Sequence, residues 1–344
     1  MKLFRILAAT AGLLAFVACS EYATVDDSVE PKEVGFQPLT SLVTKGAVDG
    51  TTFPATSAMR VSAFLNPGSH SSATGAYFTA VRFTNAGHQW KAGKYWPLDG
   101  TLNFLAYSTA TMEIAHDIIR DATWTNDVPE QSVTLTIANN NNAFDDLLYG
   151  ACNQQTFKVA GNPMQFHHAF TVVMFRVKVL DAAMAYDETT NMGVEITGFS
   201  VNNASYGGTV VISNPGTGGD APAVTASWTS LNTPLATLAA RTWPNSELVP
   251  FKPDTEYTTD SFGNAYVIMP EQAATSITLH YILHNGVDGD GTPLNNALNY
   301  NYVCSGDWLM GNKYVYDFNI ALREITVNPT VEPWDMQNMS VINL

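Results

Sequence analysis

Apolar and polar residues alternate along most of the chain after residue 33. The alternation is clearest in the second half, in the segments 173–179, 277–283 and 314–320. Shorter segments of the first half follow it too, at 60–65, 76–80, 102–107 and 133–137. Because successive side chains of a strand point to opposite faces, each segment presents one apolar face. The pattern predicts β-strands, and only residues 111–120 show a short helical pattern.

Clusters of Gly, Pro and Asn separate these strands, for example at 66–68, 85–87 and 99–100. Short strands with one apolar face and turn residues between them are typical of antiparallel sheets packed face to face. We therefore expect an all-β protein with two β-sandwich domains. The expected boundary lies near residues 161–163, which gives domains at 33–163 and 164–344.

The first 18 residues have the pattern of a cleavable signal peptide. Lys2 and Arg5 precede an apolar run of 12 residues, 6–17, which is too short to span a bilayer. Cys19 follows a small residue, as in a bacterial lipobox, so we expect lipidation at Cys19. An ordinary secretory signal with a chance cysteine is the alternative interpretation. Residues 19–32 are expected to form a flexible acidic tether, with Ser28 in a weak match to an O-glycosylation motif.

The formal net charge of −15 and the scattered positions of the 16 Lys and Arg residues exclude a basic stripe. Nucleic acid is therefore not an expected partner. With Cys19 assigned to lipid, two cysteines remain, Cys152 and Cys304. An exported protein permits a disulfide, but we expect the two residues in different domains and favour two free thiols.

No arrangement of residues indicates catalysis, a metal site or a cofactor. His167 and His168 are adjacent and would point to opposite faces of a strand. The Asp288–Gly291 segment departs from the calcium-loop pattern and is better explained as a turn. The neighbouring carboxylates Asp145 and Asp146 would also diverge. A glycosidase whose carboxylates meet only in the folded chain stays open as an alternative, although nothing in the sequence favours it.

Several ordered segments resemble the fimbrillin family, the pilins and related lipoproteins of Gram-negative gut and oral anaerobes. They are YWP at 95–97 followed by LNFLAY at 102–107, DDLLYG at 145–150, QFHHAF at 165–170 leading into 172–179, GNKYVY at 311–316, ITV at 325–327 and Trp334. The resemblance implies two tandem transthyretin-like antiparallel β-sandwich domains. It also implies that a protease removes the first strand, after which a strand from a neighbouring subunit takes its place.

Transferred to this chain, the removable segment is 33–45, with Val34, Phe36 and Leu39 as candidate core residues. Processing would occur between Lys45 and Gly46, where family members usually carry Arg. If this interpretation is right, side chains of the segment 33–45 must contribute to the interior of the first domain.

The candidate donor strand is the C-terminal segment 336–344, whose candidate core residues are Met336, Met339, Val341 and Leu344. A plain edge strand is the equally weighted alternative for this segment.

The resemblance implies a structural fimbrial (pilus) subunit, or a fimbria-associated surface lipoprotein, that assembles by donor-strand exchange and acts in cell adhesion. Its expected location is the outer membrane or the fimbrium, and its expected partners are other fimbrial subunits and the membrane. A cell-surface lipoprotein that binds a glycan or protein of a host or bacterial surface is the alternative, suggested by the seven Trp and 14 Tyr residues. No enzyme is expected.

Overall fold

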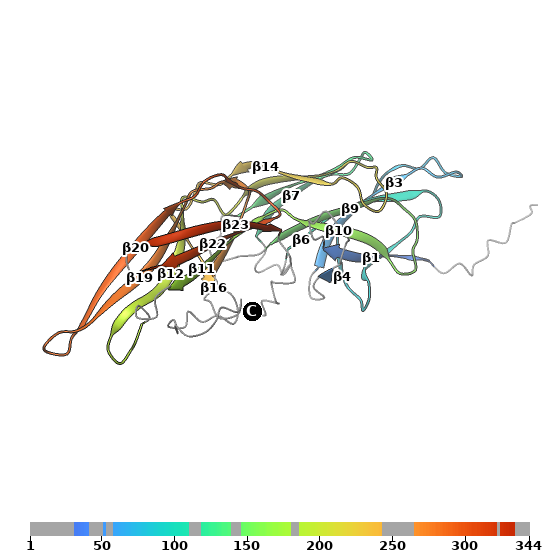
Figure 1. Cartoon of the computed structure of the whole chain (residues 1–344). Helices are drawn as coiled ribbons and strands as arrows, with labels where there is room; N and C mark the ends of the chain where they lie inside the picture. The colour runs from blue at the N-terminus through green and yellow to red at the C-terminus, as the bar shows by residue number, and fades with distance from the viewer. Residues whose placement is uncertain are drawn as a thin grey trace, which may run out of the picture.

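The computed structural model describes residues 31–40, 51–52, 58–109, 118–138, 146–179, 186–242, 265–321 and 324–333. These residues form β-strands and no helix, which confirms the all-β prediction. The short helix suggested at 111–120 is not found at its C-terminal end, because Ile119 and Arg120 begin strand β7 (Ile119–Thr125). The molecule is elongated, with the long β19–β20 hairpin at one end and the loops near β3 at the other (Figure 1).

Sheet A is the largest sheet and closes on itself. Its strands in spatial order are β10 (Asn162–His168), β9 (Leu147–Gln155), β6 (Thr101–Thr109), β3 (Ala58–Asn66), β4 (Gly75–Asn85), β5 (Trp90–Tyr95), β1 (Glu33–Thr40) and β2 (Thr51–Thr52). Strand β1 pairs with β5 on one side and with β10 on the other, so seven strands form a closed ring.

The remaining strands form four smaller sheets. Sheet B contains β14 (Thr225–Leu231), β13 (Gly208–Asn214), β8 (Gln131–Ile137) and β7 (Ile119–Thr125). Sheet C contains β16 (Arg241–Thr242), β17 (Ala265–Met269), β11 (Thr171–Val179), β22 (Asn312–Ile320) and β23 (Ile325–Pro333). Sheet D contains β15 (Thr237–Ala239), β12 (Met192–Asn202), β19 (Ser276–Val287) and β20 (Pro293–Val303), and the short strands β18 (Gln272–Ala273) and β21 (Asp307–Trp308) pair in sheet E.

Two strand pairs depart from the expected antiparallel arrangement. Strand β1 runs parallel to β10, and β11 runs parallel to β22. Parallel neighbours need a long connection between them, and both pairs join strands more than a hundred residues apart in sequence.

The expected domain boundary near residue 163 falls inside β10, which pairs with β9 and β1 in sheet A. Sheet B also joins the two halves of the sequence, because β13 pairs with β8. The organisation into two tandem sandwich domains stays a prediction.

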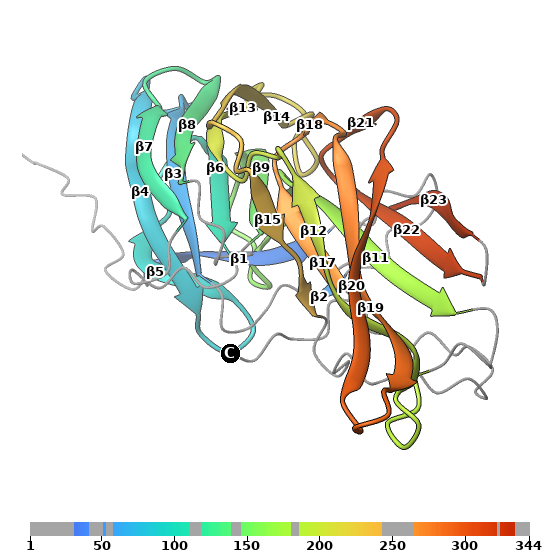
Figure 2. The ribbon, with the colours of Figure 1, turned by 90° about the vertical axis from the view of Figure 1, so that its left-hand side faces the viewer.

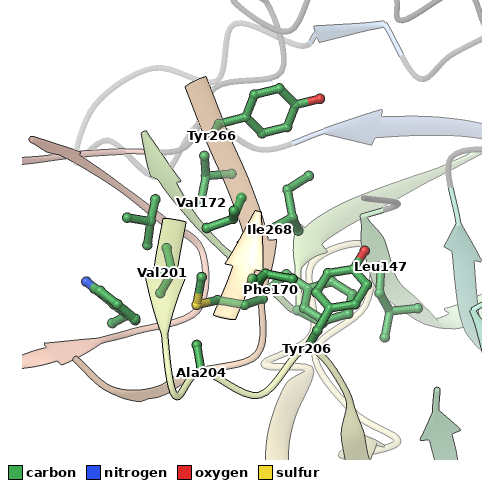
Figure 3. Packing of buried hydrophobic residues seen from close by; sticks show 14 of the residues in the cluster. Leu147, Phe170, Val172, Val201, Ala204, Tyr206, Tyr266 and Ile268 are labelled. Atoms are coloured by element: carbon green, nitrogen blue, oxygen red, sulfur yellow. The ribbon is translucent and has the colours of Figure 1, made fainter. Parts of the chain in front are cut away.

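Alternating side chains of sheet A serve two hydrophobic cores. One core fills the closed ring and includes Phe36, Phe104 and Phe166. The other lies against the outer face of sheet A and continues into the second half of the chain. Figure 3 shows Leu147 near Phe170 and Tyr206 in this second core.

A chain of buried amides holds sheet A against sheet B. Asn153 and Asn214 exchange two hydrogen bonds of 2.7 Å each. Asn214 Nδ2 also donates to Gln131 Oε1 (2.9 Å), and Gln131 Nε2 donates to Asn126 Oδ1 (2.6 Å). Asn126 in turn donates to backbone oxygens of β3 and β4. Because buried polar groups are costly when unpaired, this continuous pairing fixes how the two sheets sit on each other.

Candidate functional site

Strand β1 closes the ring of sheet A, and the residues around it form the candidate site. Phe36 to Thr40 pair in parallel with Asn162 to Phe166 of β10. On the opposite side, Gly35 and Phe36 pair with Lys91 and Trp90 of β5, with a register shift between Glu33 and Gly35. A single eight-residue strand therefore completes the hydrogen bonding of two other strands.

Alternate side chains of β1 enter the ring. Val34 and Phe36 are both 0% exposed and belong to the core of the ring. The centroid of the Phe36 ring lies 4.9 Å from that of Phe104 and 5.1 Å from that of Phe83, both in edge-to-face orientation. Such aromatic packing adds to the free energy gained from burial.

The next inward position is taken by Pro38, which is buried, whereas Gln37 is exposed. Leu39, the third candidate core residue of the segment, is only half-buried. Strict alternation from Phe36 was the signal that could have identified Pro38 in its place.

Polar contacts hold the beginning of β1 against β5. The Lys91 ammonium lies 3.5 Å from the Glu33 carboxylate, and the backbone N–H of Gly93 donates to Glu33 Oε1 (2.8 Å). The backbone N–H of Trp96 donates to the Lys32 carbonyl (2.9 Å). Because these groups are partly exposed, their contribution to stability is small, and the buried face of β1 supplies most of its attachment.

The other predicted site residues lie outside the described residues. They are Cys19, Lys45, Gly46, Met336, Met339, Val341 and Leu344. Lipidation, cleavage at Lys45 and strand donation by the C-terminal segment therefore stay predictions.

Asp146 and His168 form a buried pair that was not predicted from the sequence. His168 Nδ1 lies 2.6 Å from Asp146 Oδ2, and their side chains are 4% and 7% exposed. Asp146 precedes β9 and His168 ends β10, so the pair sits where sheet A meets the second half of the chain. Asp145 lies outside the described residues.

A second histidine lies in a row of polar side chains on sheet D. His280 Nε2 is 2.9 Å from Ser200 Oγ, and His280 Nδ1 is 2.7 Å from Asn299 Oδ1. Nucleophile, base and orienting group have this order in hydrolases. Ser200 is only 4% exposed, however, and the three residues lie on three neighbouring strands. We interpret the row as a cross-strand hydrogen-bond ladder that stabilises the sheet.

The candidate calcium loop is a turn in the structure. Asp288 Oδ1 accepts hydrogen bonds from the backbone N–H groups of Asp290 (3.0 Å) and Thr292 (2.8 Å). Within the described ranges, no three His, Cys, Asp or Glu side chains come together as possible metal ligands. Those ranges likewise contain no helix of the length and apolarity needed to cross a membrane.

Cys152 and Cys304 are both free and buried, as the sequence favoured. Burial raises the pKa of the Cys152 thiol strongly and that of the Cys304 thiol to about 11. Both thiols are therefore protonated and unreactive near neutral pH.

Comparison with known proteins identifies the family of the chain. A family model described as fimbrillin-like matches residues 45–334. The chain belongs to the fimbrillin-like family. The resemblance found in the sequence motifs is thus confirmed, and the match spans most of the strands of this fimbrillin-like protein. No curated protein matches the chain.

Solved structures of fimbrial proteins resemble this fimbrillin-like chain over most of its length. A fimbrial protein from Bacteroides vulgatus is 16% identical, with 88% of this chain and 100% of that chain covered and a TM-score of 0.55. A proposed cell adhesion protein from Bacteroides uniformis is 17% identical, with 88% and 99% covered and a TM-score of 0.48. The C-terminally truncated tip fimbrial protein Mfa3 from Porphyromonas gingivalis is 11% identical, with 80% and 94% covered and a TM-score of 0.34. At these identities, the first likeness shows a shared fold.

Proposed function

We propose that this fimbrillin-like protein is a structural fimbrial subunit, or a fimbria-associated surface lipoprotein, that acts in cell adhesion and assembles by donor-strand exchange. The observation that supports this proposal is the position of β1, which closes sheet A with pairs on both sides and buries Val34 and Phe36. Removal of β1 would expose the edges of β5 and β10 beside an apolar groove.

Such a groove is a template for association. Unpaired strand edges bind a further strand through main-chain hydrogen bonds, and alternate side chains set the register. When each copy donates to the next, the contact does not close on itself and a filament grows. Other fimbrial subunits are the proposed partners, and the C-terminal segment with Met336, Met339, Val341 and Leu344 is the proposed donor.

The surface location follows from the same proposal. Lipid on Cys19 would tether the precursor to the outer membrane, and cleavage between Lys45 and Gly46 would separate the tether and β1 from the rest of the chain. Two transthyretin-like sandwich domains would then remain as the assembling unit.

Limited trypsin digestion of the purified precursor tests the proposal. We expect a cut near Lys45 to convert monomers into ladders on size exclusion and filaments in electron micrographs, because β1 is then free to leave. The variant Lys45→Gln should resist this cut and stay monomeric, whereas Lys45→Arg should behave as the natural chain. Cleanly cut protein that stays monomeric would contradict the assembly role.

A binding role for a surface glycan is the second candidate, supported by the outer face of sheet D. Strands β12, β19 and β20 contain one acidic residue, Glu195, and no Lys or Arg. Amide and hydroxyl groups such as those of Asn299, Asn301 and Thr278 line this face. Neutral donors and acceptors match the hydroxyl groups of an uncharged glycan. Together with β12, the β19–β20 hairpin that carries them projects from the lower end of the molecule in Figure 2.

A glycan array tests this second role. We expect binding to neutral glycans that falls at least about tenfold in the double variant Asn299→Ala, Asn301→Ala, a loss of about 1.4 kcal/mol. The variant Gln37→Ala, on the distant β1, should bind as the natural chain does. Absence of binding to every neutral glycan would exclude this role for the sheet D face.

A further inference from the structure

One polar side chain in the ring of sheet A is buried without any hydrogen bond. Asn162, the first residue of β10, is 0% exposed, and neither its Nδ2 nor its Oδ1 has a partner. Alternation along β10 places it on the same inward face as Met164 and Phe166. A buried amide costs free energy unless it is paired, so the ring closed by β1 contains an unsatisfied group.

The neighbours of Asn162 explain why it stays unpaired. Phe36 of β1 is its partner in the parallel register, and Met164 is the next inward residue on its own strand. Phe36 offers only hydrocarbon, and the Met164 thioether is at best a weak acceptor. Strand β1 therefore matches the apolar part of the groove but not the amide at its end.

We propose that Asn162 is a selectivity residue of the β1 groove, which favours an incoming strand with a hydrogen-bonding side chain next to this amide. This inference rests on the proposed strand exchange. A segment that pairs Asn162 gains a hydrogen bond that β1 cannot make, so the amide biases the groove toward exchange.

The proposed occupant is the C-terminal segment of a second copy. Strand β23 ends at Pro333, and residues 334–344 follow it. These 11 residues exceed the eight of β1. Alternation that points Met339 and Val341 into the groove points Gln337 and Asn343 the same way, so these two are the polar side chains aimed at the amide.

Thermal unfolding of Asn162→Leu tests whether the amide is unsatisfied. Leu has the same number of side-chain heavy atoms as Asn, so we expect the melting temperature to rise by about 2–4 °C. Asn214→Leu is the matched control, because Asn214 is 1% exposed but fully hydrogen-bonded. The melting temperature of Asn214→Leu should fall by a similar amount. A lower melting temperature for Asn162→Leu would overturn the inference.

Competition with peptides tests the selectivity. Protein cut at Lys45 is mixed with a peptide of residues 334–344, or with a peptide in which Gln337 and Asn343 are Leu. Native mass spectrometry then measures the displaced fraction of the β1 fragment. We expect the preference for the natural peptide over the apolar one to fall about tenfold in Asn162→Leu, equivalent to about 1.4 kcal/mol.

The outcomes separate this inference from the proposed function. If both peptides displace β1, but the preference for the natural peptide over the apolar one is the same in the natural protein and in Asn162→Leu, the role of Asn162 is overturned and strand exchange is left intact. Failure of both peptides to displace β1 from either protein would overturn strand exchange by the C-terminal segment, and the selectivity of Asn162 with it.

Discussion

Replacement of Phe36 by Ala is expected to lower the free energy of unfolding by about 3–5 kcal/mol, the usual cost of truncating a buried aromatic residue. Phe36 is 0% exposed and contacts the rings of Phe83 and Phe104. Because β1 has core residues on one face only, the loss weakens the attachment of the whole strand and opens the ring where β1 pairs with β5 and β10. Urea unfolding measures the free energy, and limited proteolysis measures how readily β1 detaches from β5 and β10.

The neighbouring residue provides the control for this prediction. Gln37 is exposed on the same strand, and Gln37→Ala should change the free energy of unfolding by no more than about 0.5 kcal/mol. A loss below about 1 kcal/mol for Phe36→Ala would mean that the ring core is stable without β1, and the proposed groove would lose its physical basis.

The variant His168→Leu should cost about 3–5 kcal/mol of stability, because it leaves the buried Asp146 carboxylate without its hydrogen-bond partner. The two groups are 2.6 Å apart and almost fully buried. The other oxygen of Asp146, Oδ1, already lacks a hydrogen-bond partner, so the carboxylate depends on His168. Chemical denaturation at fixed pH measures the effect.

Two further variants show whether the loss comes from the buried charge. Adding Asp146→Asn to His168→Leu should recover part of the stability, because the neutral amide is cheaper to bury than a carboxylate. Lys158→Ala breaks the exposed pair with Asp220, whose side chains are 37% and 56% exposed, and should cost less than about 1 kcal/mol. Equal losses for Lys158→Ala and His168→Leu would refute the burial argument.

Sequence alternation predicted the strands well because burial of one face leaves a period of two residues. The segments 102–107, 133–137 and 314–320 all lie within observed strands. The family resemblance, rather than alternation, named Val34 and Phe36 as core residues of the first strand, and both are buried.

Alternation did not predict which strands are neighbours. The period of a strand fixes the face of each side chain but carries no information about its partner. The parallel pairing of β1 with β10 joins segments far apart in sequence. The contact between Asp146 and His168 depends on the antiparallel pairing of β9 with β10, which places His168 opposite Leu148. Pro163 was placed at the expected domain boundary, yet it lies in β10. Proline is tolerated near the start of a strand, where its missing N–H matters least.

The composition of sheet B has a consequence for any attempt to divide the molecule. Its central strands, β8 and β13, come from opposite halves of the sequence and share seven register pairs. Either half made separately would present one of these strands as a bare edge, with the apolar side chains of Leu135 or Val210 in water. The two halves should therefore depend on each other for solubility, and regain it as complementary fragments of one folding unit.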